Sequence, residues 1–243
     1  MKRRATILPA GNGRLLNHRP PVTPPEEVGN DLLVWQLVDS AFPTGGFAHS
    51  AGLEAAWQHG EVRNRADLLA FAEAGLEQVG HAGLPFVSAA YAAPGKLPEF
   101  DRRCDVFTTN HVANRASRAQ GRALLTALER VFSVLLQGQP DEIPFAHFAP
   151  VFGAGLQRLG LSRLTAGRMF FFNHLRGVLA AAVRLNIVGP IEAQHLQHRL
   201  APKTEAILRK CEALSLDDLA QTAPLLDLWQ GAQDRLYSRL FQS

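Results

Sequence analysis

The sequence predicts an all-α protein in which residues 30–243 form a single bundle of about ten helices. Alanine and leucine dominate the composition and β-branched residues are sparse, a balance that favours helix over sheet. Apolar residues recur at three- and four-residue steps, and no segment alternates as a half-buried strand does. The 243 residues, 47% hydrophobic and 19% charged, are typical of one large globular domain.

Residues 1–29 are expected to form a disordered tail outside the bundle. The tail is basic, with no acid before Glu26, and its prolines forbid a continuous helix. These prolines are Pro9, Pro20, Pro21, Pro24 and Pro25. A transit peptide would be an amphipathic helix and a secretory signal would have an apolar central region, so neither is expected.

The helices of the bundle are placed by caps, glycines and prolines. Asp31 and Asn64 are expected to cap helices at their N-termini, and Gly60 to close one at its C-terminus. The expected helices cover about 31–40, 50–59, a helix from 64 that Gly80, Gly83 and Pro85 bend or split, 98–107, 110–137, 144–159, 162–185, 190–200, 202–214 and 224–241. Pro190, Pro202 and Pro224 each suit the first turn of a helix.

Most common enzyme and membrane signatures are absent from the sequence. There is no Walker A motif, no GxGxxG, no HExxH and no GxSxG. No apolar run reaches the roughly 18–20 residues that span a bilayer, so no membrane association is expected. His195 and His198 share a helix face, but stable metal sites usually need three or four ligands, so no metal site is predicted. The two cysteines, Cys104 and Cys211, are expected to be reduced, as in a cytoplasmic protein.

Residues 39–54, DSAFPTGGFAHSAGLE, form the most specific stretch of the sequence. Gly45 and Gly46 allow a sharp turn between two helices, and Ser50 can cap the second helix. Glu54 stands on a short helix in apolar surroundings, where we expect it to face solvent or a partner. A tightly packed interhelical turn explains the glycines but not this acid.

Two later stretches also predict protein contacts. Arg115, Arg118 and Arg122 fall on one helical stripe, which is either a solvated face or a surface for an acidic partner. Residues 223–243 carry two apolar stripes, of which only one can pack on the bundle. The second stripe includes Tyr237 and Phe241 and needs a cover, which indicates a protein interface.

Two other functions remain open at this point. Asp39, His49 and Ser50 could form a hydrolase triad, although such residues also cap helices and bond to turns. The net charge of +3 and the arginine stripe could belong to a nucleic-acid-binding regulator, but the basic residues are spread along the chain with acids among them.

Taken together, the 39–54 motif, the Asn114-Arg-Ala-Ser stretch, the helix anchored by Pro190 and the closing DRLYSRLFQS resemble the urease accessory protein F family. The resemblance covers about residues 31–243. It implies an all-helical, dimeric, non-catalytic scaffold in the cytoplasm, which binds accessory protein D (H in some organisms) and the nickel-carrying GTPase, accessory protein G. The assembly would deliver nickel to apo-urease and regulate GTP hydrolysis; nickel would transit the complex, and no cofactor would be bound stably. No nucleic-acid partner is expected.

The resemblance also implies roles for individual residues. The accessory protein D/H interface would include Leu236, Tyr237, Arg239, Leu240 and Phe241. A second surface, for dimerisation or for the GTPase, would include Gly45, Gly46, His49, Ser50, Glu54, Arg115 and Arg118.

Overall fold

The chain is all-helical in a computed structural model that describes residues 30–136 and 143–243. Within these two ranges the backbone forms helices and turns, with no strand, so the predicted fold class is confirmed. The predicted tail, residues 1–29, lies outside the described residues. Among the described helices, none combines the length and apolar character that a bilayer crossing needs.

The α-helices differ in length, from short connectors to three helices of 22 residues. They are α1 Asp31–Val38, α2 Leu53–Gln58, α3 Arg65–Gln78, α4 Leu84–Ala92, α5 Leu97–Phe107, α6 His111–Phe132, α7 Phe148–Arg158, α8 Arg163–Arg184, α9 Pro190–Cys211 and α10 Pro224–Ala232. Single turns of 3₁₀-helix cover η1 Gly46–Ala48, η3 Pro94–Lys96 and η5 Gln233–Arg235, and a π-helical turn, η2, covers Val79–Gly83.

Several predicted helix ends are present in the structure. The Asn64 side chain accepts hydrogen bonds from the backbone N–H groups of Ala66 and Asp67, as an N-cap does. Gly60 follows α2 with a φ of 78°, the left-handed conformation that glycine adopts most readily. The predicted interruption at Gly80 and Gly83 is the π-turn η2. Asp31 is not a cap, however: it is the first residue of α1, and Asn30 occupies the N-cap position.

Several predicted boundaries are wrong. The helix expected over 110–137 ends at Phe132, and the one expected from about 144 begins at Phe148. Pro202 does not begin a new helix, because α9 continues through it from Pro190 to Cys211. Leu196, Leu200, Ile207 and Cys211 are buried along one face of α9, and this packing compensates for the hydrogen bond that Pro202 cannot donate. The last helix, α10, ends at Ala232 rather than near Phe241, because the chain beyond η5 extends away to bond with another part of the molecule.

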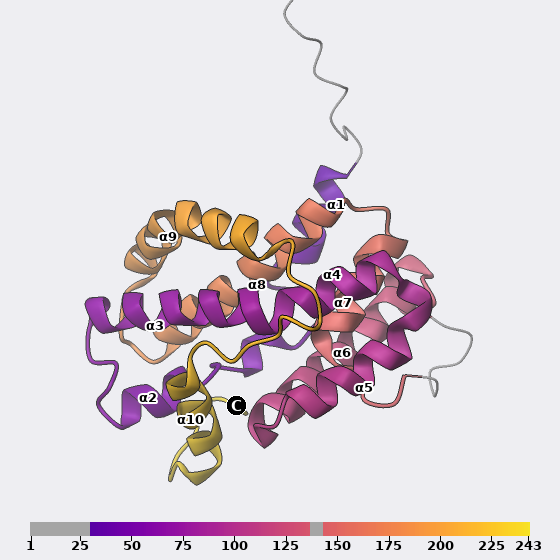
Figure 1. The fold of residues 1–243 in the computed structure, drawn as a ribbon. Helices are drawn as coiled ribbons and strands as arrows, with labels where there is room; N and C mark the ends of the chain where they lie inside the picture. Colours follow the sequence, from indigo (N-terminus) through magenta and orange to yellow (C-terminus); the bar gives the residue numbers. More distant parts are fainter. Residues whose placement is uncertain (1–29, 137–142) are drawn as a thin grey trace, which may run out of the picture.

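The helices form two packed groups joined by α3, η2 and α4 (Figure 1). In one group α4, α5 and α6 pack around α7, and in the other α3, α8 and α9 pack together. The two groups share one continuous core of leucine, alanine and phenylalanine side chains. α10 follows a long connection from α9 and lies beside α2 and α6. This brings the residues that follow α10 close to α2, near the beginning of the described chain.

A buried carboxylate, Asp101 on α5, fixes the start of α7. Its two oxygens accept hydrogen bonds from three successive backbone N–H groups, of Phe145 (2.7 Å), Ala146 (3.0 Å) and His147 (2.7 Å). These residues precede α7 and have no helical partners for their N–H groups. Asp101 thereby sets the direction in which the chain enters α7.

Candidate docking site

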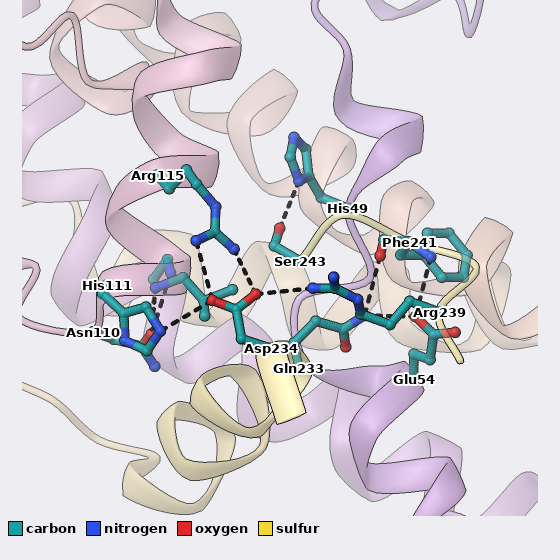
Figure 2. A network of polar contacts seen from close by, with 12 residues as sticks. His49, Glu54, Asn110, His111, Arg115, Gln233, Asp234, Arg239, Phe241 and Ser243 are labelled. Atoms are coloured by element: carbon teal, nitrogen blue, oxygen red, sulfur yellow. Dashed lines mark hydrogen bonds and ion pairs between the residues drawn. The ribbon is translucent and has the colours of Figure 1, made fainter. Parts of the chain in front are cut away.

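The three stretches singled out in the sequence meet in space at the C-terminal end of the chain (Figure 2). Residues 233–243, which we call the C-terminal segment, follow α10 and cross over α2 and the loop of residues 45–52. The same segment reaches the arginine stripe of α6 through an ion pair. Parts of the chain nearly 200 residues apart therefore form one surface.

Glu54 on α2 is the anchor of this surface. Its side chain is buried, and its carboxylate accepts hydrogen bonds from the backbone N–H groups of Leu240 (2.6 Å) and Phe241 (3.1 Å). The Gln233 side-chain amide donates a third hydrogen bond at 2.6 Å. The expectation that Glu54 faces solvent or a partner is therefore wrong, because the C-terminal segment of the same chain covers it. Buried carboxylates are found where donors of this kind satisfy them.

The loop before α2 holds the last residues of the segment by backbone pairing. Gln242 N–H donates to the carbonyl of Ala48 at 2.8 Å, and Ser50 N–H donates to the carbonyl of Ser243 at 2.5 Å. His49 Nδ1 lies 2.5 Å from Ser243 Oγ. Burial and, to a lesser degree, the charge of Arg115 lower the pKa of His49, so its imidazole is neutral near pH 7.

Glycine is required in this loop at Gly52. It has a φ of 85°, and a Cβ added there would lie 2.8 Å from the backbone nitrogen of Gln230 on α10. No side chain fits so close an approach, which lets α10 rest directly on the loop. Gly45 also adopts a left-handed φ, of 70°, at the turn before η1, whereas Gly46 begins that turn with an ordinary φ.

Asp234 joins the C-terminal segment to α6. Its carboxylate accepts two hydrogen bonds from the Arg115 guanidinium, at 2.8 and 3.1 Å, in a bidentate pair. Arg239 Nη1 and His111 Nε2 lie 3.1 and 3.2 Å from the same carboxylate. The hydrogen bond and charge of Arg115, and to a lesser degree those of His111, lower the pKa of Asp234. Asp234 and Gln233 are not predictable from the sequence, since nothing nearby in the sequence marks their distant partners.

The segment turns some of its apolar side chains outward. Tyr237 is fully exposed, and Leu240 is 51% exposed. Leu225 and Leu228 on α10 are exposed to about two thirds, at 65% and 66%. Phe241, in contrast, is buried, with the Arg184 guanidinium 4.2 Å above its ring. The five residues predicted to bind accessory protein D/H thus have different environments: Leu236 is half-buried and Arg239 takes part in the Asp234 cluster.

The residues proposed for a hydrolase triad do not form one. Asp39 Oδ1 accepts a hydrogen bond from Ala41 N–H in a tight turn, and Ser50 Oγ accepts one from Glu54 N–H. The hydrogen bond of the His49 ring is to Ser243 rather than Ser50. The contacts of Asp39 and Ser50 are local bonds to the backbone, which such residues commonly make in turns.

A cavity of about 410 Å³ lies between the two helix groups. Phenylalanine side chains from η1, α4, α5, α7 and α8 line it, together with Asn173 and His174 of α8. Asn173 Oδ1 and His174 Nε2 are buried without a hydrogen-bond partner. Burial lowers the pKa of His174 to about 4, which keeps the ring neutral. No group of three or more His, Cys, Asp or Glu side chains in residues 30–136 and 143–243 is arranged to hold a metal ion.

A comparison with known proteins identifies the family. A family model described as UreF matches residues 62–201, more than half of the chain. The chain belongs to the UreF family. The resemblance seen in the sequence motifs is therefore confirmed.

Curated relatives extend the match beyond that region. A protein of Arabidopsis thaliana named urease accessory protein F is 41% identical over 219 residues, covering 86% of this chain and 91% of its own. A protein of the same name from Oryza sativa subsp. indica is 39% identical over 216 residues, covering 85% and 83%. A UreF-like protein of Schizosaccharomyces pombe is 32% identical over 224 residues, covering 85% and 94%. UreF-family similarity thus extends over most of the chain.

Proposed function

We propose that this chain is a non-catalytic scaffold for urease maturation. It joins accessory protein D/H to the nickel-carrying GTPase, accessory protein G, so that nickel reaches apo-urease. Nickel passes through the complex as cargo, no cofactor is bound stably, and the chain regulates GTP hydrolysis without performing it. The work takes place in the cytoplasm. Membership of the UreF family, whose relatives are named urease accessory proteins, is the observation that carries this proposal.

The C-terminal segment supports a docking role. Tyr237 and Leu240 project outward from a backbone that Glu54 holds in place. Together with Leu225 and Leu228 they leave large apolar side chains exposed around one end of the chain. Exposed apolar side chains gathered on one surface usually mark protein interfaces, and rigid aromatic residues often contribute most of the binding energy. We assign this surface to accessory protein D/H.

A homodimer forms part of the same proposal. On α8, a Cβ added at Gly177 would meet no atom within 4 Å, and Ala180 is exposed. Phe47, whose carbonyl accepts a hydrogen bond from Arg184 of α8, is 72% exposed. Small residues beside an exposed aromatic ring let a second helix approach closely. This face suits a second copy of the chain.

The alternative functions receive less support. Asp39 and Ser50 bond to nearby backbone N–H groups and His49 bonds to Ser243, which does not favour a hydrolase. Arg115 is neutralised by Asp234, which breaks the continuity of the arginine stripe that a nucleic-acid-binding regulator would use.

Paired substitutions test the docking surface. Tyr237→Asp with Leu240→Asp changes only exposed side chains, and we expect it to reduce co-purification of accessory protein D by about tenfold or more, as the loss of one interface hot spot does. The control is Val106→Asp with Ile191→Asp, which changes side chains that are 78% and 77% exposed elsewhere. Equal co-purification by both variants would show that the surface is wrongly assigned.

A further inference from the structure

The arginine stripe of α6 borders an open hollow that the docking surface does not use. The hollow has a volume of about 540 Å³. Its lining is polar, with several positive charges and no acidic side chain. The lining residues are Thr108, Thr109, His111, Asn114, Arg115, Arg118 and Arg122.

One end of the stripe already binds a carboxylate of the same chain. Arg115 holds Asp234 in a bidentate pair, with His111 beside it. This geometry is typical of guanidinium groups that recognise carboxylates. The C-terminal segment therefore provides, within the structure, an example of the ligand that this face of α6 accepts.

The next two arginines of the stripe carry the same guanidinium group as Arg115 but are not paired with a carboxylate. Within residues 30–136 and 143–243, neither Arg118 nor Arg122 forms an ion pair, and Arg118 Nε is buried without a hydrogen-bond partner. The nearby acid, Asp105, has other partners: its Oδ1 accepts from Asn114 Nδ2 at 2.9 Å and lies 3.1 Å from His147 Nε2. These two contacts and, more weakly, the charge of Arg118 lower the pKa of Asp105, but Arg118 forms no ion pair with it. The hollow thus presents two guanidinium groups that take part in no ion pair among the described residues.

Phe145 holds these guanidinium groups in position. The Arg118 guanidinium lies 5.2 Å from the centre of the Phe145 ring, and Arg122 Nη1 donates to the Phe145 carbonyl at 3.3 Å. Asp101 in turn fixes the backbone of Phe145. Because the side chains are already ordered, an acidic ligand would lose little conformational freedom of the arginines on binding.

We propose that this hollow binds an acidic segment of a protein partner, with carboxylates that pair with Arg118 and Arg122 in the way Asp234 pairs with Arg115. The three arginines rise along α6 by about 4.5 and 6 Å. Alternate side chains of an extended segment are about 6.6 Å apart, close to the rise of about 6 Å between Arg118 and Arg122. The proposal rests on the docking role proposed above and adds a second contact surface to it, next to the C-terminal segment.

A peptide of six glutamates labelled with fluorescein tests the hollow directly. Titrated with the full chain at low salt, it should bind, and binding should weaken as salt is raised. Arg118→Gln with Arg122→Gln should weaken binding by about tenfold or more, since each lost charged hydrogen bond is worth roughly a factor of ten. The matched control, Arg130→Gln with Arg158→Gln, removes the same charge from exposed positions outside the hollow and should change binding by less than about twofold.

Three results would overturn the inference. The first is no binding of the glutamate peptide by the wild-type chain. The second is equal binding by the double-arginine variant and its control. The third is tighter binding of a labelled 12-nucleotide DNA strand through the same arginines, which would assign the hollow to nucleic acid.

The same peptide separates this inference from the docking proposal. Tyr237→Asp with Leu240→Asp leaves the hollow intact and should bind the glutamate peptide as the wild type does. If that variant still co-purifies accessory protein D while the peptide result holds, the C-terminal docking surface is wrong and the acidic-segment site stands.

Discussion

At the scale of single residues, Glu54 determines the position of the C-terminal segment after α10. One buried carboxylate takes up three donors that would otherwise be unsatisfied, two from the backbone and one from Gln233. A hydrogen bond to a charged group contributes about 1.5–3 kcal/mol, and an unpaired buried group costs a comparable amount. Glu54 therefore acts through the position of the C-terminal segment, with its own side chain out of reach of a partner.

Replacing Glu54 by Gln should release this segment while leaving the bundle folded. The amide would place N–H groups against the N–H groups of Leu240 or Phe241, which removes at least one acceptor. We expect trypsin to cleave after Arg239 about tenfold faster than in the wild type, since a loss of about 1.4 kcal/mol corresponds to that factor.

Glu61→Gln supplies the control for this measurement, because Glu61 is an exposed acid close in the sequence. It should leave the cleavage rate unchanged. Equal cleavage rates in the Glu54→Gln variant and the wild type would mean that the segment is held by other contacts, such as the pairing of Gln242 with Ala48.

At the scale of helices, glycine controls how closely α7 approaches its neighbours. A Cβ added at Gly153 would lie 2.1 Å from the carbonyl oxygen of Val87 on α4, a distance that no side chain allows. α4 and α7 therefore pack with their backbones in direct contact, and they form the centre of one of the two helix groups.

Gly153→Ala should separate α4 from α7 and destabilise the protein. Overpacking of this kind typically costs about 1–3 kcal/mol, and here the obstructing atom belongs to the backbone, which cannot move aside alone. Chemical denaturation should show a lower midpoint. Gly95→Ala is the control, since an added Cβ there meets nothing within 4 Å. A Gly153→Ala variant as stable as this control would contradict the described packing of α7.

The sequence predicts local features of these helices well. The Asn64 cap, the left-handed Gly60 and the interruption at Gly80 and Gly83 all depend on residues within a turn of each other. Pro202 and the end of α10 were predicted wrongly because distant contacts decide them. The buried face of α9 outweighs one lost hydrogen bond, and Glu54 draws the last residues away from a helical path.

In the candidate site, too, local features were predictable from the sequence and distant contacts were not. The apolar stripes predicted that both Tyr237 and Phe241 would lack a cover, and this is right for Tyr237, which is fully exposed, but wrong for Phe241, which is buried. Which side chains face outward was not predictable, because Phe241 turns inward beneath Arg184, more than 50 residues earlier in the chain. Asp234 was missed for a similar reason, since its partner Arg115 is distant in the sequence.

At the scale of the whole molecule, the fold brings three separate stretches of sequence to one end. The loop of residues 45–52 and α2 hold the C-terminal segment, and α6 holds Asp234 (Figure 2). The result is a preformed apolar surface beside a basic hollow. Preformed surfaces bind with a smaller loss of conformational entropy than segments that fold on binding, which suits the scaffold role proposed above.

The most direct measurement is the nickel content of urease purified from a urease-producing host that lacks its own UreF-family protein and carries this chain instead. The wild-type chain, and the control Val106→Asp with Ile191→Asp, should restore the metal. Tyr237→Asp with Leu240→Asp should leave urease with less than about a tenth of it, following the expected loss of docking. Urease that is fully loaded with nickel by the Tyr237/Leu240 variant would contradict the account.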